Sequence, residues 1–158
     1  MNKATTSVAH VRWMVRRDLK TVLCIEESSF EFSWTEEDFL RCLRQRQCTG
    51  MVAEVQGEVI GYMIYELHKN RLHLLKLVVD PCHRRNWLGK ALIETLIGKL
   101  SVDRRNRIML EVRETNLVAQ KFFRSMGFKA ISVLRDFYED TPEDAYLMQY
   151  RLIEWCGD

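Results

Sequence analysis

A short basic segment is the part of the sequence with the clearest chemical character. Residues 81–92 read PCHRRNWLGKAL and follow the apolar run LVVD. The segment places Arg84, Arg85 and Lys90 at the start of a predicted helix, where unpaired backbone N–H groups and a partial positive charge attract anions. Gly89 lacks a side chain, which permits close approach of a ligand to the backbone. The segment predicts a diphosphate site, although a solvated basic turn has the same composition.

A second candidate group is the carboxylate of Glu111. It lies in the stretch RIMLEV, residues 107–112, which alternates between apolar and other side chains as a strand does. Alternation places Glu111 on the face opposite the apolar residues, where it can point into a cleft and accept a proton from a substrate. The alternative is a structural one, since a Glu in a strand is commonly exposed or paired with a cation, here Arg113.

The other residues that bear reactive groups give weaker signals. The four histidines do not form a ligand pattern, because the His68/His73 spacing crosses a turn without a carboxylate or thiol placed for a metal, and we predict no metal site. The five cysteines are odd in number and form no CxxC pair, which argues against a disulfide framework and a zinc site. Cys82 lies beside the basic segment, but we interpret it as an ordinary loop residue.

Periodicity and turn signals arrange the chain as β-α-α-β-β-β-α-β-α-β-β. A strand at 10–16 precedes a helix that Asp18 can cap, and Thr35 with Asp38 three residues later predicts a capping box for a second helix. The following segments are assigned by pattern. They are strands at 51–55 and 59–67, which form a hairpin through the turn-prone QGE at 56–58, and a strand at 72–80. A helix from Leu88 to Leu100, a strand at 107–112, a helix at 115–127 ending at Gly127, and strands at 128–138 and 144–152 follow. This order is typical of a mixed sheet with helices on both faces.

Bulk composition limits the class of protein. A chain of 158 residues with 47% hydrophobic content fits one domain, with its core over about 11–152. The net charge of +2 gives no overall attraction to nucleic acid, so we expect no direct nucleic-acid binding. No apolar run reaches the roughly 20 residues of a membrane span, and the cysteine content suits a reducing compartment, so we expect a cytoplasmic protein that does not bind membranes.

The basic segment resembles the acetyl-CoA loop of the GNAT superfamily, written Gln/Arg-x-x-Gly-x-Gly/Ala. Arg84, Gly89 and the helix start match this pattern, whereas Trp87 stands at the first glycine. The resemblance implies a GNAT fold, a mixed, mostly antiparallel seven-stranded sheet, with acetyl-CoA as co-substrate. Either the indole of Trp87 points outward and only backbone donors matter, or the affinity for acetyl-CoA is reduced.

Further motifs resemble one GNAT family, the ribosomal-protein-alanine N-acetyltransferases. LEVRETN is similar to that family's LEVR-x-x-N, which implies that Glu111 is the general base and that Asn116 lies near the cofactor.

AQKFFRSMGF is similar to A-x-x-x-Y-x-x-x-G-F, in which the tyrosine is the general acid. Phe123 stands at that position and has no proton to donate. A coenzyme A thiolate is a good leaving group, so turnover without this acid is reasonable. Pattern alone makes Phe122 and Phe123 helix-core residues with Val118, Ala119 and Met126, and we prefer this interpretation for Phe122.

Two motifs concern the acceptor substrate. FEFSWTEEDF resembles F-x-F-P-W-S-E-x-x-F, a bend that walls the peptide site in N-terminal acetyltransferases, so Phe32 and Trp34 are substrate candidates, with a core role as the alternative. LRDFYEDTPEDAYLM resembles R-x-Y-Y…D-A-x-x-M, which makes Tyr138, in the loop of the closing hairpin, a candidate for binding the substrate backbone and for replacing the missing acid. The resemblance extends from about residue 11 to residue 152.

The resemblance implies an enzyme that transfers acetyl directly from acetyl-CoA to the N-terminal amine of a protein, with alanine as the first residue. The acceptor would be a ribosomal protein of the small subunit or another protein, and the enzyme a monomer or weak dimer. The backbone and side-chain groups implied for the cofactor are Val78, Val79, Arg84, Arg85, Asn86, Trp87, Leu88, Gly89, Lys90, Asn116 and Phe123. Val78 and Val79 would stabilise the oxyanion with backbone N–H groups.

Two other functions fit the same sequence. One keeps the chemistry and replaces the protein with a small-molecule amine, because one fold accommodates many acceptors. The other is a degenerate domain that binds acyl-CoA without turnover, a reading favoured by Trp87 and Phe123. Retention of Arg84, Glu111 and Asn116 favours catalysis.

Overall fold

The computed structural model describes residues 8–84 and 87–153, and their elements follow the predicted order. The strands are β1 (His10–Trp13), β2 (Cys48–Val55), β3 (Glu58–Leu67), β4 (Leu72–Val79), β5 (Arg107–Arg113), β6 (Lys129–Leu134) and β7 (Ala145–Arg151). The helices are α1 (Leu19–Ser29), α2 (Glu36–Leu43), α3 (Leu88–Ile97) and α4 (Leu117–Ser125), with 3₁₀ turns η1 (Arg16–Asp18) and η2 (Pro81–His83).

The strands form one sheet in the order β1-β2-β3-β4-β5-β7-β6. β1 pairs antiparallel with β2, and β7 pairs antiparallel with both β5 and β6. β4 pairs parallel with β5, with Leu72 opposite Ile108 and His73 opposite Met109. The predicted fold class, a mixed α/β sheet of the GNAT type, is confirmed, and its parallel pair arises from the strand–helix–strand connection between β4 and β5.

Contacts divide the chain into two compact units. Unit 1 contains residues up to Ile64 together with Lys76–Thr95, and unit 2 contains Tyr65–Leu75 together with the chain from Leu96 onward. The prediction that residues 1–158 form a single domain remains a prediction, and each unit is described by itself below.

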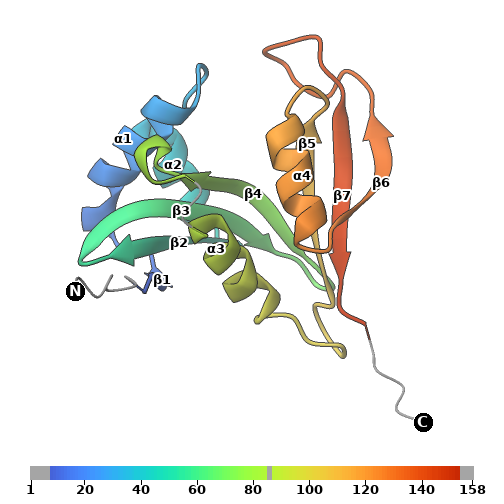
Figure 1. Ribbon diagram of the computed structural model, residues 1–158, viewed down its shortest axis with the longest axis horizontal. Helices are drawn as coiled ribbons and strands as arrows, with labels where there is room; N and C mark the ends of the chain where they lie inside the picture. The colour runs from blue at the N-terminus through green and yellow to red at the C-terminus, as the bar shows by residue number, and fades with distance from the viewer. Residues whose placement is uncertain (1–7, 85–86, 154–158) are drawn as a thin grey trace, which may run out of the picture. The chain divides into compact units, whose positions relative to one another are not determined.

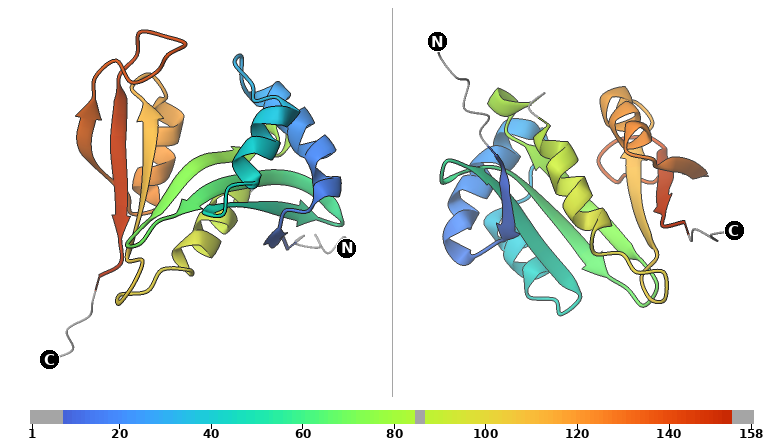
Figure 2. Two further views of the ribbon diagram at one scale, coloured as in Figure 1. Left: turned by 180° about the vertical axis from the view of Figure 1, so that it is seen from behind. Right: turned by 60° about the horizontal axis from the view of Figure 1, so that its bottom comes forward.

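In unit 1, helices cover both faces of the strands: α1 and α2 lie over one face of β2 and β3, and α3 lies over the other (Figures 1 and 2). The core on the α1–α2 side contains fully buried Val22, Phe39, Val52 and Tyr62. Fully burying a side chain of this size stabilises the fold by roughly 1.5–3 kcal/mol. The apolar stripes on α1 and α2 therefore fix these helices against the sheet.

Two local predictions for unit 1 are confirmed. Thr35 begins α2 with a reciprocal capping box, in which Thr35 Oγ1 accepts from the Asp38 N–H at 3.2 Å and the Asp38 carboxylate accepts from the Thr35 N–H at 2.9 Å. The hairpin between β2 and β3 turns at Gln56 and Gly57, whose φ values of 52° and 80° belong to the left-handed region that two-residue hairpin turns require.

Asp18 stands at the N-cap position of the first helix, as predicted, but its side chain makes no capping hydrogen bond to α1. Its carboxylate, which is 5% exposed, instead accepts two hydrogen bonds from the Arg12 guanidinium, at 2.8 and 2.9 Å, and one from the Val15 N–H at 2.8 Å. These bonds hold the 3₁₀ turn η1 before α1. The strand predicted at 10–16 therefore ends at Trp13. The hydrogen bonds from Arg12, followed by that from Val15, hold the pKa of Asp18 below its ordinary value.

Replacing Asp18 should weaken the fold in a pH-dependent way. We expect Asp18→Asn to lower the free energy of unfolding by about 2 kcal/mol at neutral pH, because the buried carboxylate that pairs with Arg12 is lost. A depressed carboxyl pKa gives stability that is present above the unfolded pKa and is lost as the pH falls through the folded pKa. The variant should therefore lose less stability than the native protein between about pH 6 and about pH 3, as measured by urea unfolding.

The matched control for Asp18 is Glu54, which accepts from the Nε of the same Arg12 at 3.1 Å but is 23% exposed. Glu54→Gln should lower the free energy of unfolding by less than about 1 kcal/mol. Equal losses in the two variants, or unchanged acid sensitivity in Asp18→Asn, would contradict this account of Asp18.

Unit 2 is organised around β5, β7 and β6, with α4 along one face of these strands (Figure 1). β5 alternates as predicted: Ile108, Leu110 and Val112 are buried, and the residues between them are half-buried. The ring of Phe128 lies 5.4 Å from Phe123 on α4 and 5.6 Å from Tyr150 on β7. These contacts attach α4 to the sheet.

In unit 2 the end of one predicted element is confirmed and the end of another needs correction. Gly127 terminates α4 with φ 94°, as predicted, and positive φ is the conformation that glycine adopts most easily. The strand predicted at 128–138 ends at Leu134. Two residues later Asp136 has φ 51° and donates its N–H to the Asp144 carboxylate at 2.8 Å, which bends the chain into a loop. Val118, which pattern placed in the core with Phe122, is 81% exposed.

Candidate active site

In unit 1, the predicted anion segment begins where β4 ends. Arg84 folds back onto this strand, and its Nε donates to the Val79 carbonyl at 3.2 Å. The Asp80 carboxylate accepts from the Cys82 N–H at 2.9 Å, and the Asp80 carbonyl accepts from the His83 N–H at 2.8 Å, which closes the turn η2. The turn and the ion-dipole contact of Arg84 thus fix the direction in which the chain leaves the sheet.

Trp87 has a left-handed backbone conformation, which is uncommon for a residue other than glycine. Its φ is 50°, its side chain is 48% exposed, and its carbonyl accepts the first α3 hydrogen bond, from the Ala91 N–H at 3.0 Å. The sequence left open whether the indole faces outward or disturbs the loop. The half-exposed ring and the intact helix start favour the first alternative, and the left-handed backbone is a strained position for a residue with a Cβ.

A pair of substitutions separates the backbone of Trp87 from its indole. Trp87→Gly and Trp87→Ala both remove the ring, but only glycine relieves the left-handed strain. We expect the glycine variant to be more stable than the alanine variant by about 1 kcal/mol in urea unfolding. Calorimetric titration with acetyl-CoA should give dissociation constants for Trp87→Gly and native protein within about threefold of each other, since the backbone donors are retained. Weaker binding by more than tenfold would show that the indole contributes to the site.

The remaining cofactor candidates of unit 1 differ in what they can offer. Val78 and Leu88 are 3% and 2% exposed, so only their backbone groups can reach a ligand. Val79 is half-buried, and Lys90 is exposed with its Nζ 3.8 Å from Glu94. Gly89 lies in the first turn of α3 and is half-buried. Arg85 and Asn86 lie outside the described residues.

In unit 2, Glu111 forms a close pair with a histidine. His73 Nε2 lies 2.8 Å from Glu111 Oε2, and the two side chains are 17% and 19% exposed. The structural alternative, a pair between Glu111 and Arg113, is not what the structure shows. Arg113 instead donates to both oxygens of Asp140, at 3.0 and 2.8 Å. No sequence pattern indicated His73 as a partner of Glu111, because 38 residues separate the two.

Arg113 also positions Tyr138. Its guanidinium carbon lies 3.7 Å from the centre of the Tyr138 ring, and it donates to Thr141 Oγ1 at 2.8 Å. Tyr138 is half-buried in the loop between β6 and β7, as predicted. Burial is the main cause that raises the pKa of Tyr138, the nearby Arg113 charge opposes it, and the Glu111 charge adds to it. The phenol therefore stays protonated at neutral pH and can donate a hydrogen bond.

The two cofactor candidates on or beside α4 have clear structural contacts. Asn116 caps α4, with its Oδ1 accepting from the Ala119 N–H at 3.1 Å. Phe123 is 7% exposed and contacts Phe122 and Phe128 edge to face. The helix that follows β5 thus buries Phe123 and leaves Phe122 half-buried, the reverse of the core preference drawn from pattern.

The segment between α1 and α2 carries the two substrate candidates. Phe32 is 57% exposed, whereas Trp34 packs edge to face on Phe39 at 5.2 Å and against the unit 1 core. The Trp34 N–H donates to Glu26 Oε1 at 2.9 Å. The substrate role remains a prediction for both residues, and only Phe32 offers a largely free aromatic surface.

Glu26 is the centre of a buried polar network that the sequence did not predict. Its carboxylate, which is fully buried, accepts from the Tyr62 hydroxyl and from the Lys76 ammonium. The Lys76 Nζ also lies 4.4 Å from the ring centre of Trp34 and 4.7 Å from that of Phe30. Burial lowers the pKa of Lys76, and the Glu26 carboxylate opposes this effect.

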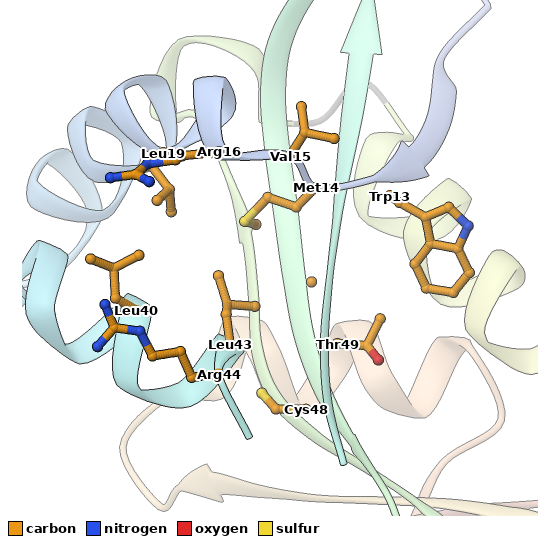
Figure 3. Close-up of a pocket in the computed structure, with 11 residues that line it drawn as sticks. Trp13, Met14, Val15, Arg16, Leu19, Leu40, Leu43, Arg44, Cys48 and Thr49 are labelled. Carbon is orange, nitrogen blue, oxygen red and sulfur yellow. The ribbon is translucent and has the colours of Figure 1, made fainter. Parts of the chain in front are cut away.

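A cavity of about 450 Å³ in unit 1 is separate from all these residues. It is lined by residues at the end of β1, the beginning of α1, the end of α2 and the beginning of β2, among them Met14, Leu19, Leu43 and Cys48 (Figure 3). The Sγ atoms of Cys42 and Cys48 lie 2.7 Å apart, a contact that the sequence spacing did not suggest. None of the predicted site residues that the structure describes lines this cavity.

Two findings bear on metals and membranes. Within residues 8–84 and 87–153, no group of three or more His, Cys, Asp or Glu side chains is arranged to hold a metal ion. Each of the two histidines has one carboxylate neighbour that the sequence did not indicate, Glu66 for His68 and Glu111 for His73. No helix in the described part of the chain has the length and apolar character needed to cross a bilayer.

Comparison with known proteins agrees with the fold. The model of the acetyltransferase (GNAT) family matches residues 17–128. The chain belongs to the GNAT family. As a member of this family, the protein is an N-acetyltransferase.

Among curated relatives of this GNAT chain, the [ribosomal protein bS18]-alanine N-acetyltransferase of Escherichia coli (strain K12) is 30% identical over 133 residues, which cover 83% of this chain and 89% of the relative. The crystal structure of the Escherichia coli ribosomal-protein-S18-alanine N-acetyltransferase aligns with a TM-score of 0.83 and 26% identity, covering 93% of this chain and 96% of that one. Arabidopsis thaliana NAA60, solved in complex with acetyl-CoA, aligns with a TM-score of 0.80 over 92% of this chain and all of its own, and at 19% identity this likeness concerns the fold alone.

Proposed function

We propose that this protein transfers the acetyl group of acetyl-CoA to the N-terminal amine of a protein whose first residue is alanine. The pair of Glu111 and His73 carries the proposal, because it supplies a carboxylate that is largely buried yet reachable. An N-terminal ammonium must lose a proton before it attacks a thioester, and a carboxylate is suited to accept it, directly or through water. The family relationship to an alanine N-acetyltransferase supports the same acceptor.

The cofactor would be held by the anion segment of unit 1. Backbone N–H groups at the start of α3 and the guanidinium of Arg84 suit the diphosphate of acetyl-CoA. Backbone N–H groups of Val78 and Val79 would receive the developing oxyanion. When the tetrahedral intermediate collapses, the C–S bond breaks and the coenzyme leaves as a thiolate, so the absence of a tyrosine at Phe123 does not block the reaction.

The acceptor would be bound by aromatic and hydroxyl groups. We propose that Phe32 and Trp34 contact its first residues and that Tyr138, held by Arg113, donates a hydrogen bond to its backbone. A ribosomal protein of the small subunit is the acceptor that the family relationship favours.

One experiment tests cofactor and acceptor together. The purified protein is titrated with acetyl-CoA in a calorimeter and then mixed with a peptide beginning Ala-Arg-Tyr, and the products are identified by mass spectrometry. We expect binding and a single added acetyl group on the α-amine. A peptide of the same sequence with a blocked N-terminus is the control and should gain none, even if it contains lysine.

The other outcomes decide between the alternatives. Binding without acetylation of the peptide, but with acetylation of a small amine, would replace the protein acceptor with a small molecule. Binding without acetylation of either acceptor would indicate a degenerate acyl-CoA-binding domain. A failure to bind acetyl-CoA would overturn the cofactor assignment.

A further inference from the structure

The hydrogen bond between His73 and Glu111 has a defined donor and acceptor. An ionised carboxylate accepts hydrogen bonds and has none to donate, so at 2.8 Å the proton lies on His73 Nε2. The hydrogen bond uses Oε2 of Glu111. Within the described residues, no other hydrogen bond to this carboxylate is found, so Oε1 is left to receive a proton from a substrate. His73 therefore restricts rotation of Glu111 without occupying the oxygen that would react.

The backbone fixes the two residues in register. His73 is opposite Met109 in the parallel pairing of β4 and β5, and Glu111 follows Met109 by two residues on the same face of β5. β5 is held on its other edge by β7, with Glu111 opposite Leu147. Both side chains thus project from paired strands, which hold functional groups more accurately than loops do.

A further layer of contacts supports His73. The His68 ring lies edge to face with the His73 ring at a centroid distance of 6.3 Å, and His68 Nε2 lies 3.6 Å from Glu66 Oε1. The turn that connects His68 to His73 is anchored, because Arg105 Nε donates to the His68 carbonyl at 2.7 Å. In the described part of the chain, the titratable groups that contact His73 are therefore the Glu111 carboxylate on β5 and the His68 imidazole in the turn after β3.

We propose that His73 is a positioning residue that holds Glu111 in the orientation needed for proton transfer and that the two act as one unit. The proposal rests on the proposed function, in which Glu111 is the base. Misplacing a catalytic group by about 1 Å can lower a rate by roughly 10²-fold, so losing the hydrogen bond should lower kcat by about tenfold or more. KM for the peptide should stay within about threefold, because His73 acts on the base and does not bind the acceptor.

Two amide substitutions form a matched test. In His73→Gln, the amide nitrogen reaches the position of Nε2 and can still donate to Glu111, whereas in His73→Asn the side chain is too short by one methylene group. We expect kcat of the Gln variant within about threefold of native and kcat of the Asn variant lower by about tenfold. The double variant His73→Asn, Glu111→Gln should be no slower than Glu111→Gln alone, because groups that act as one unit are non-additive.

The exposed His10 on β1 provides the control, and His10→Gln should leave kcat unchanged. Equal activity of the Asn and native proteins, or losses that multiply in the double variant, would overturn the positioning role while peptide acetylation by the native protein stands. A native protein that does not acetylate the peptide would refute the proposed function instead.

A spectroscopic measurement tests the hydrogen bond between His73 and Glu111 independently of enzyme activity. Nitrogen-15 NMR of the His73 ring should show the proton fixed on Nε2 in the native protein and a mixture of the two tautomers in a Glu111→Ala variant. The same tautomer signature in both proteins would overturn the proposed pairing, whichever acceptor the enzyme uses.

Discussion

Glu111→Gln should lower kcat for transfer to an Ala-first peptide by about 10²-fold or more while leaving the dissociation constant of acetyl-CoA within about twofold of native. The glutamine amide has the size of the carboxylate but cannot accept the amine proton at neutral pH. The hydrogen bond from His73 can be kept by the amide oxygen, so the fold is preserved. Steady-state kinetics with detection of the released thiol gives kcat, and calorimetry gives the dissociation constant.

The control for this substitution is Glu58→Gln, an exposed carboxylate at the beginning of β3 in unit 1. It should change neither kcat nor binding. Turnover of Glu111→Gln within threefold of native would remove Glu111 from the mechanism. A large loss of acetyl-CoA affinity would instead show that the carboxylate supports the cofactor site.

Single substitutions in the buried pair of Glu26 and Lys76 should strongly destabilise unit 1. Lys76→Met leaves a fully buried carboxylate without its cation, and Glu26→Gln leaves an ammonium whose side chain is 12% exposed. Breaking a buried pair from one side typically costs about 3–5 kcal/mol. For a chain of this size, this corresponds to a fall of about 10 °C in the melting temperature. Urea unfolding and calorimetry measure the two quantities.

The double variant Glu26→Gln, Lys76→Met should recover most of the lost stability, because both charges are absent and only the hydrogen bonds to Tyr62 and Trp34 are altered. The exposed pair of Glu37 and Arg41 is the control, and Arg41→Met should change the free energy of unfolding by less than about 0.5 kcal/mol. Additive losses in the double variant would contradict the account of a coupled buried pair.

The pH dependence of the Glu26→Gln variant follows from the environment of Lys76. Burial lowers the pKa of this ammonium, and its partner carboxylate is the main opposing influence. A lysine pKa that is depressed in the fold makes the unfolded chain bind more protons, so the free energy of unfolding rises as the pH increases toward the unfolded pKa of about 10.4. The destabilisation of Glu26→Gln should therefore be larger near neutral pH than near about pH 9.

The sequence by itself determined the elements whose signals are local. The capping box of Thr35 and Asp38, the turn at Gln56 and Gly57 and the end of α4 at Gly127 each depend on a few adjacent residues, and all three were predicted. Hydrophobic periodicity then gave the order of strands and helices, and motif resemblance singled out Glu111 and Tyr138 as candidates. The family and the fold class follow from such short-range patterns.

The tertiary structure alone decided which side chains meet. Glu26 and Lys76 are 50 residues apart, and His73 and Glu111 are 38 residues apart. Hydrophobic periodicity describes only neighbouring residues, so it does not indicate which distant side chains form such pairs. Asp18 looked like a helix cap because the local pattern fits one, but the Arg12 guanidinium offers its carboxylate a stronger, charge-assisted partner. Local patterns specify which backbone forms, whereas contacts between charged side chains depend on how sheet registers and packed helices bring distant residues together.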